Sequence, residues 1–207
     1  MILPLLNTDM VLSSVYTYST DAALWDDFLT GNRAAYALMY ERYAKTLYNY
    51  GYKIAQNRQV TEDCLQDLFL TILETRDRLG RTDSIKFYLM RSLRREIVRR
   101  LQAEQRFDPT AADCPDALEF QVEFHYEPTW LDAQISAEQS AALLVELNAL
   151  PARQKEALFL KYFDNLSYEE IAGVMNIEQS SAYKIIYKAI AALQKRVGNS
   201  VLLLLLV

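Results

Sequence analysis

Apolar residues recur every three or four positions in two separate parts of the chain, and that spacing is typical of amphipathic helices. The first such segment begins near Thr61, which is placed to cap a helix that carries Glu62 and Asp63 in its first turn, near the positive end of the helix dipole. Its apolar positions are Leu65, Leu68, Phe69 and Ile72. The spacing predicts that four polar side chains share its exposed side: Glu62, Asp63, Gln66 and Asp67.

A longer helix is predicted from Ser84 to about Gln105, because apolar residues repeat there at i, i+4. This apolar ridge consists of Ile85, Leu89, Leu93, Ile97 and Leu101. The opposite side is basic and consists of Arg91, Arg95 and Arg99, with Arg94 at its border. At about 100° per residue, Tyr88 falls within the same stripe. The helix is therefore predicted to expose a positive strip that contains an aromatic side chain.

A second helical part begins at Leu150-Pro151, which opens a segment that runs through Phe163. Ser167 is placed to cap a short helix over 168–172, and residues 173–177 supply the following turn. The next helix runs from about Glu178 to Lys195, and its buried positions are Ala182, Ile186, Ala189 and Leu193. Its outward positions are Gln179, Ser180, Tyr183, Lys184, Tyr187 and Lys188. This order of elements is that of a helix-turn-helix unit, whose second helix enters the major groove of DNA.

Residues 107–149, between these helical parts, contain nine acidic residues, three prolines and no Lys or Arg. No sustained apolar period appears there before about Ala133, so the segment is predicted to be a linker. Glycine and proline are scarce, with five each in the chain, which favours helices over a turn-rich β protein. We therefore predict an all-α protein with two small helical domains at 21–106 and 150–198, an acidic linker at 107–149 and an apolar tail at 199–207.

The net charge of −5 comes from the linker rather than from the predicted domains. Residues 21–106 carry fifteen Lys and Arg against twelve Asp and Glu, and residues 150–198 carry seven against five. Both domains are thus mildly basic, so the acidity of the whole chain does not exclude nucleic acid as a partner. The acidic linker leaves two interpretations open: it masks the basic surfaces of the free protein as a substitute polyanion, or it only keeps the protein dispersed.

Several function classes lack the residues they need. Cys64 and Cys114 are too few for a disulfide framework, and the single histidine, His125, rules out most zinc-site spacings. No Gly-rich phosphate loop, paired metal ligands or nucleophile with a nearby histidine occurs. We expect no enzyme activity, no metal or cofactor and no small-molecule substrate. Neither end holds the roughly 20 apolar residues that span a bilayer, so we expect a cytoplasmic protein whose terminal leucines pack onto a core or fray.

Two groups of motifs lie in order on either side of the acidic segment. The first group is Tyr36-x-x-x-Tyr40-x-x-Tyr43, then Glu62-Asp63-x-x-Gln66-Asp67-x-Phe69, then a basic helix from Lys86 to Arg100. The second is Leu150-Pro151 and Leu166-Ser167-Tyr168-Glu169-Glu170-Ile171-Ala172. Together they resemble the sigma-70 family of RNA polymerase sigma factors, extracytoplasmic-function (ECF) group, and within it the forms common in Bacteroidetes-type bacteria. The resemblance implies a sigma-2 domain in the first part and a sigma-4 domain in the second.

The resemblance implies an alternative sigma factor that binds core RNA polymerase, directs it to promoter DNA and takes part in opening the duplex. It assigns polymerase binding to Glu62, Asp63, Gln66 and Asp67, which otherwise form an ordinary solvated face. It assigns capture of the melted minus-ten strand to Phe87, Tyr88, Arg91, Arg94, Arg95 and Arg99. Aromatic stacking and phosphate contact would hold such a strand, although burial in the core is the alternative for Phe87. A membrane-bound anti-sigma factor is a further implied partner.

For the recognition helix, the resemblance implies contact with the minus-thirty-five element through Gln179, Ser180, Ser181, Tyr183, Lys184, Tyr187 and Lys188. The first three are expected to contact base edges and the lysines to contact phosphates. The chain departs from the family where Ile185 replaces a usual Arg and Glu178 a usual Ser or Thr cap. Arg95 and Arg99 also stand where Asn or Asp is common, which is expected to strengthen sequence-independent strand binding.

A competing hypothesis is an autonomous helix-turn-helix transcriptional regulator, with residues 21–106 as a sensor or dimerisation domain. The second domain is compatible with both hypotheses. The acidic face and the Arg-rich helix favour the sigma factor, because a ligand sensor needs neither of them. Co-purification with core polymerase distinguishes the two.

Overall fold

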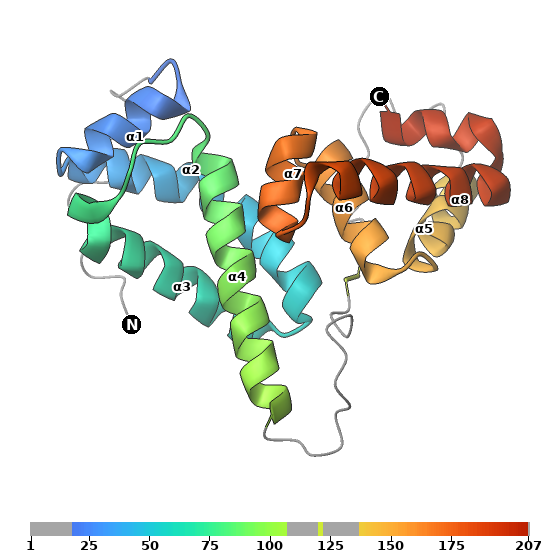
Figure 1. Ribbon diagram of the computed structural model, residues 1–207, viewed down its shortest axis with the longest axis horizontal. Helices are drawn as coiled ribbons and strands as arrows, with labels where there is room; N and C mark the ends of the chain where they lie inside the picture. The colour runs from blue at the N-terminus through green and yellow to red at the C-terminus, as the bar shows by residue number, and fades with distance from the viewer. Residues whose placement is uncertain (1–17, 107–119, 122–136, 207) are drawn as a thin grey trace. The chain divides into compact units, whose positions relative to one another are not determined.

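The computed structural model describes residues 18–106, 120–121 and 137–206 (Figure 1). These residues form eight α-helices and one short 3-10 helix and contain no strand, which confirms the all-α class. They divide into two compact units, the first with residues 18–52 and 57–104, the second with 53–56 and the described residues beyond 104. Cys114 and His125 lie outside the described residues, as does most of the predicted linker on which the masking hypothesis depends.

The first unit contains four α-helices and the 3-10 helix. They are α1 (Asp21–Leu29), α2 (Arg33–Ala55), α3 (Arg58–Thr75), η2 (Arg76–Arg78) and α4 (Ile85–Arg106). Each α-helix contributes apolar side chains to the core, among them Trp25, Met39, Leu68 and Leu89. The Trp25 indole N–H donates to the Gly80 carbonyl at 2.9 Å, so even the polar atom of the largest core side chain is satisfied.

Asp21, the first residue of α1, links three helices. One carboxylate oxygen accepts a hydrogen bond from the Ile85 N–H at 3.0 Å, and the other accepts from the Tyr43 hydroxyl at 2.5 Å. The first bond satisfies an N–H group that the start of α4 leaves without an intrahelical partner. Burial, together with the bond to Asp21, raises the pKa of Tyr43 to about 12, so its hydroxyl remains a donor at neutral pH.

The other two tyrosines of the motif on α2 contact α3. The Tyr36 hydroxyl donates to the Phe69 carbonyl at 3.1 Å, and burial raises the pKa of Tyr36 to about 12. The Tyr40 and Phe69 rings meet edge to face, with centroids 4.9 Å apart. The three tyrosines therefore hold α2 against α1 and α3, which makes them structural residues.

The start of α3 differs from the prediction, and Thr61 is not its cap. The Asn57 side chain caps the helix by accepting from the Val60 N–H at 3.2 Å. Thr61 is fully buried instead, and a Cβ atom at Gly51 would lie 3.2 Å from its methyl carbon and 3.1 Å from Ile97 Cδ1. The missing side chain of Gly51 thus lets α2 approach α3 and α4 closely. Glu62 and Asp63 consequently lie in the second turn, where the helix dipole has little effect.

Helix α4 agrees with the prediction of a helix from Ser84 to about Gln105. The predicted ridge residues Ile85, Leu89, Leu93 and Ile97 are fully buried, and Leu101 is half-buried. The i, i+4 spacing identified this helix because every ridge position packs into the same core.

The second unit contains α5 (Ala137–Asn148), α6 (Ala152–Tyr162), α7 (Tyr168–Met175) and α8 (Gln179–Leu206). α8 packs against the other three helices, and its predicted core positions are buried. The structure places α5 within the residues predicted to be linker. Leu143 and Leu147 are buried one turn apart, and Glu146 pairs with Arg196 of α8 at 3.2 Å. The last proline of that segment is Pro128, so nothing in residues 137–148 prevents a helix.

Helices α7 and α8 form the predicted helix-turn-helix. Ser167 caps α7 as predicted, in a capping box with Glu170. The turn begins later than predicted: residues 173–175 remain helical because Val174 and Met175 are buried, and Asn176 takes the left-handed conformation with φ 54°. α8 continues to Leu206, so the predicted tail is helical up to that residue. Across the described ranges, no helix has both the length and the apolar character needed to cross a bilayer.

Candidate nucleic-acid and protein interfaces

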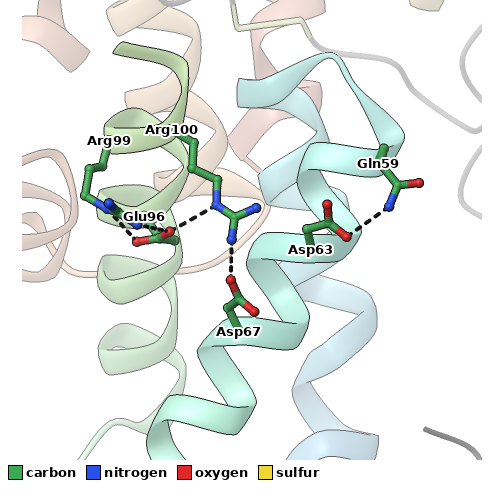
Figure 2. Close-up of polar contacts among 6 residues, drawn as sticks. All are labelled: Gln59, Asp63, Asp67, Glu96, Arg99 and Arg100. Atoms are coloured by element: carbon green, nitrogen blue, oxygen red, sulfur yellow. Dashed lines mark hydrogen bonds and ion pairs between the residues drawn. The ribbon is translucent and has the colours of Figure 1, made fainter. Parts of the chain in front are cut away.

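The polar side of α3 carries the four residues predicted to bind a protein partner. Gln66 and Asp67 are exposed, whereas Glu62 and Asp63 are half-buried. Glu62 accepts a hydrogen bond from Arg58 Nε at 2.7 Å. Asp63 accepts from Gln59 Nε2 at 2.9 Å (Figure 2). Both contacts join residues four apart, which are neighbours on a helix surface. The face is acidic, but the charge of Glu62 is already compensated by Arg58.

Asp67 reaches across to α4, where it accepts a hydrogen bond from Arg100 (Figure 2). Arg100 also donates through Nε to Glu96 at 3.1 Å, and Arg99 donates to the same carboxylate at 2.6 and 3.0 Å. These hydrogen bonds, above all the one from Arg99, hold the pKa of Glu96 below its ordinary value. We refer to Asp67, Glu96, Arg99 and Arg100 as the charge cluster. It contains two positive and two negative groups, so it is neutral as a unit.

The basic strip of α4 divides into unpaired and paired arginines. Arg91 and Arg95 are exposed and form no ion pair with any residue that the structure describes. Arg99 is also exposed, but it donates two hydrogen bonds to the Glu96 carboxylate. Arg94 is half-buried at the border of the strip. Two of the four predicted phosphate-contacting arginines are therefore exposed and have no ion-pair partner in the part of the chain that the structure describes.

The two aromatic residues predicted to stack on a DNA strand are each half-buried. Tyr88 was predicted within the exposed stripe, but its ring lies 5.0 Å from that of Trp25, and burial raises its pKa. The reason is that Tyr88 packs against Trp25 of α1, which is itself fully buried. Phe87 lies beside it on the helix and keeps part of its surface accessible. The strip is therefore mainly basic, with aromatic surface at one end.

Two residues that organise this face were not among the predicted site residues. Glu96 holds Arg99 and Arg100, and Arg100 joins α4 to α3 through Asp67. The spacing of Glu96 to the two arginines, i, i+3 and i, i+4, is a signal that the sequence contains. The contact between Arg100 and Asp67 spans 33 positions and depends on how the two helices pack.

The recognition helix α8 exposes its predicted DNA-contacting residues on one face. Gln179, Ser180, Tyr183, Lys184, Tyr187 and Lys188 are exposed, and Ser181 is half-buried. Lys184 and Lys188 pair with no acidic group in the described part of the chain. Ile185 is half-buried. Glu178 directly precedes α8, and its backbone carbonyl accepts a hydrogen bond from the Ser181 N–H at 2.9 Å.

Tyr183 is held by residues of two other helices. Its ring lies on that of Tyr168 from α7, with centroids 3.8 Å apart and planes 19° from parallel. The ammonium group of Lys161 from α6 lies 4.8 Å from the Tyr168 centroid. We refer to Lys161, Tyr168 and Tyr183 as the aromatic stack. Lys161 and Tyr168 were not predicted site residues, and no spacing in the sequence connects them to Tyr183.

Two family models match the elements that carry these surfaces. Sigma-70 region 2 matches residues 39–107, which include α3 and α4. Sigma-70 region 4 matches residues 140–193, which include α6, α7 and the first half of α8. The two regions occur in the order expected from the motifs and cover both units.

Relatives with known names agree with these matches. The ECF RNA polymerase sigma factor BldN of Streptomyces coelicolor is 26% identical over 170 residues, which are 80% of this chain and 61% of that protein. The ECF sigma factor SigW of Bacillus subtilis is 23% identical over 172 residues, or 82% of this chain and 92% of that one. The sigma factor RpoE of Bartonella quintana, solved with the anti-sigma factor NepR, has a similar fold, with a TM-score of 0.53 and 21% identity over 73% of this chain and 89% of that chain. The chain belongs to the sigma-70 family, as a sigma factor of the extracytoplasmic-function group.

Proposed function

We propose that this sigma factor docks on core RNA polymerase through α3, captures the melted minus-ten strand with α4 and contacts the minus-thirty-five element with α8. Its family role is to direct promoter recognition and transcription initiation. One observation supports the residue assignment most strongly. An acidic side of α3 and a basic side of α4 lie on adjacent helices of one unit, and Asp67 and Arg100 connect them.

The acidic side of α3 suits a protein partner, because its carboxylates repel phosphates. Gln66 and Asp67 are its most exposed polar members. Leu70 and Leu73 are exposed one and two turns further along the same side. Apolar area of this kind, rimmed by polar groups, is typical of protein interfaces. We therefore assign the binding of core polymerase to this surface.

The basic strip of α4 suits a single DNA strand, which proteins hold through backbone phosphates and base stacking. Arg91 and Arg95 can contact phosphates without first leaving a partner among the described residues. Arg99 must first exchange Glu96 for a phosphate. Phe87 and Tyr88 offer partly accessible rings at the start of the helix, where unpaired bases would stack.

The exposed face of α8 suits duplex DNA. Gln179 and Ser180 lie at the start of the helix, the part that contacts base edges in helix-turn-helix proteins. Lys184 and Lys188 lie one turn apart and supply positive charge for phosphates on either side of the groove.

In this role the protein is not an enzyme: the core polymerase carries out nucleotide addition, and both act in the cytoplasm. We also propose an anti-sigma factor as a partner, membrane-bound as the family resemblance implies. The similar fold of a sigma factor solved together with an anti-sigma factor supports this partner class.

In vitro transcription with core polymerase on a library of genomic fragments tests the proposal. We expect transcripts that start at discrete positions, preceded by shared minus-ten and minus-thirty-five elements, only when this protein and the core enzyme are both present. Sequence-specific binding to duplex DNA by the protein alone, without stoichiometric loading on polymerase, would overturn it in favour of an autonomous regulator.

A further inference from the structure

The aromatic stack lies on the face of α8 that is proposed to enter the major groove. The Tyr168 and Tyr183 rings are nearly parallel and in contact. Lys161 lies close enough to the Tyr168 ring for cation–π attraction. Side chains from three helices are thus in contact in series: Lys161 of α6 with Tyr168 of α7, and Tyr168 with Tyr183 of α8. Its last member, Tyr183, still exposes 50% of its surface.

Both supporting residues are held by contacts of their own. Lys161 Nζ donates to the Leu166 carbonyl at 3.3 Å. Tyr168 is the first residue of α7, directly after Ser167, whose capping box fixes the start of that helix. Tyr183 therefore stacks on a support that the packing of α6 and α7 determines.

A tyrosine that is already ordered loses less conformational freedom when it binds a ligand. Tyr183 presents its uncovered ring surface in one orientation, with an apolar body and a hydroxyl group at the tip. Gln179 lies one turn before it on the same face, and Tyr187 lies one turn after it with 76% of its surface exposed. The central stripe of the face is thus an amide followed by two aromatic rings.

The chemistry of this stripe favours A·T base pairs. Glutamine hydrogen-bonds adenine N6 and N7, and apolar side chains contact the C5-methyl group of thymine. Arginine or lysine is the commonest partner of guanine. Helix α8 contains no arginine between residues 179 and 195, Arg196 pairs with Glu146 at 3.2 Å, and the exposed Lys184 and Lys188 are the residues proposed to contact phosphates. Lys184 and Lys188 already supply charge for phosphates, which leaves the Tyr183 ring for an apolar contact.

We propose that Tyr183 contacts the C5-methyl group of a thymine in the minus-thirty-five element, and that Tyr168, supported by Lys161, is the positioning residue that orients it. The inference rests on the proposed function, because it requires α8 in the major groove. A hydrogen bond from the Tyr183 hydroxyl to a phosphate is the competing use of this side chain, and the experiment separates the two.

The test uses the holoenzyme, made from the full chain and core polymerase, and a promoter found by start-site mapping. Each thymine of its minus-thirty-five element is replaced in turn by deoxyuridine, which lacks only the methyl group. We expect one of these replacements to weaken promoter binding by holoenzyme that contains the unsubstituted protein, the parent, about fourfold, as for the loss of one buried methyl contact. The same replacement should not change promoter binding by holoenzyme that contains the Tyr183→Ala variant. Tyr183→Phe should keep the penalty, because the ring remains.

Three results would overturn the methyl contact. The first is that no deoxyuridine replacement changes binding by the parent. The second is that Tyr183→Ala shows the same penalty as the parent. The third is that Tyr183→Phe binds as weakly as Tyr183→Ala, which would indicate a phosphate contact through the hydroxyl.

The positioning role of Tyr168 is tested with the same DNA. Tyr168→Phe should keep the deoxyuridine penalty, and Tyr168→Ala should lose it while the helicity and thermal unfolding of the protein stay close to those of the parent. If Tyr168→Ala does not fold, Tyr168→Leu replaces it, since leucine keeps apolar volume without a ring. A folded Tyr168→Ala or Tyr168→Leu protein with the full penalty would refute the positioning role. Failure of the proposed function looks different, because the parent would then form no holoenzyme and give no promoter-dependent transcript.

Discussion

Helices α4 and α8 both expose basic residues beside aromatic ones, but they differ in what is already engaged in the free protein. On α4 two of the basic charges are engaged, since Glu96 holds Arg99 and Arg100. On α8 an aromatic ring is engaged, since Tyr183 stacks on Tyr168, while no described residue forms an ion pair with Lys184 or Lys188.

The difference shows that an exposed charge is not always an available charge. An arginine that leaves an exposed ion pair gives up about 0.2 to 1 kcal/mol before it gains anything from a phosphate. In the proposed DNA contacts, the arginines of α4 that pair with Glu96 therefore depend on that neighbour, whereas no described residue competes for the charge of Lys184 or Lys188.

The largest effect is expected from reversing the acidic side of α3. The double substitution Asp63→Lys and Asp67→Lys should abolish co-purification with core polymerase, because it replaces two negative charges with two positive ones at the proposed docking surface. The fold should survive, since Asp67 and Arg100 form a partly exposed ion pair whose loss costs about 0.2 to 1 kcal/mol. Glu41→Lys, an exposed reversal on α2, is the matched control and should bind normally. Unchanged co-purification of the double variant would exclude α3 as the docking surface.

A smaller effect is expected from Lys184→Ala on α8. Promoter binding by the holoenzyme should weaken severalfold at low salt, and the slope of log K against log salt should fall by about 0.9, as for one lost phosphate contact. Lys195→Ala, near the other end of the predicted recognition helix, should change neither quantity. The preferred promoter sequence should stay the same. A changed preference would make Lys184 a base-contacting residue instead.

A comparison of two arginines on α4 tests the difference between free and paired charge directly. Arg95→Ala should slow promoter opening more than closed-complex formation, because its strip faces a strand that is separated only on melting. Arg99→Ala should have a weaker effect, since Arg99 must first leave Glu96. Stopped-flow measurement of the two steps distinguishes them. Equal effects of the two substitutions would mean that the ion pair does not limit Arg99.

The smallest effect is expected from Glu96→Gln in the charge cluster. The substitution should lower the free energy of unfolding at pH 7 by about 0.2 to 1 kcal/mol, the range for exposed ion pairs. Because the pKa of Glu96 lies below its ordinary value of 4.5 in the folded protein, its contribution is present above that value and is lost as the pH falls through the folded pKa. Denaturation at several pH values should show parent and variant converging in acid. A gap that does not shrink at any acid pH at which both proteins remain folded would contradict this account.

Much of the fold could be predicted because helical periodicity is local. The buried ridge of α4, the core positions of α8 and the Ser167 cap all follow from residues within a few turns of one another. The start of α3 was mispredicted for a related reason. Asn57 and Thr61 are both suitable caps by type, and only the close approach at Gly51 shows that Thr61 belongs to the core.

The sequence by itself determined which residues lie on which face of each helix, and hence the acidic side of α3, the basic strip of α4 and the outward face of α8. Only the tertiary structure decided which of those residues are engaged by another helix, through the contact of Asp67 with Arg100 and of Tyr183 with Tyr168. The physical reason is that a helix face depends on the order of residues along one helix, whereas a contact between helices depends on where packing of the core places side chains that are far apart in the chain.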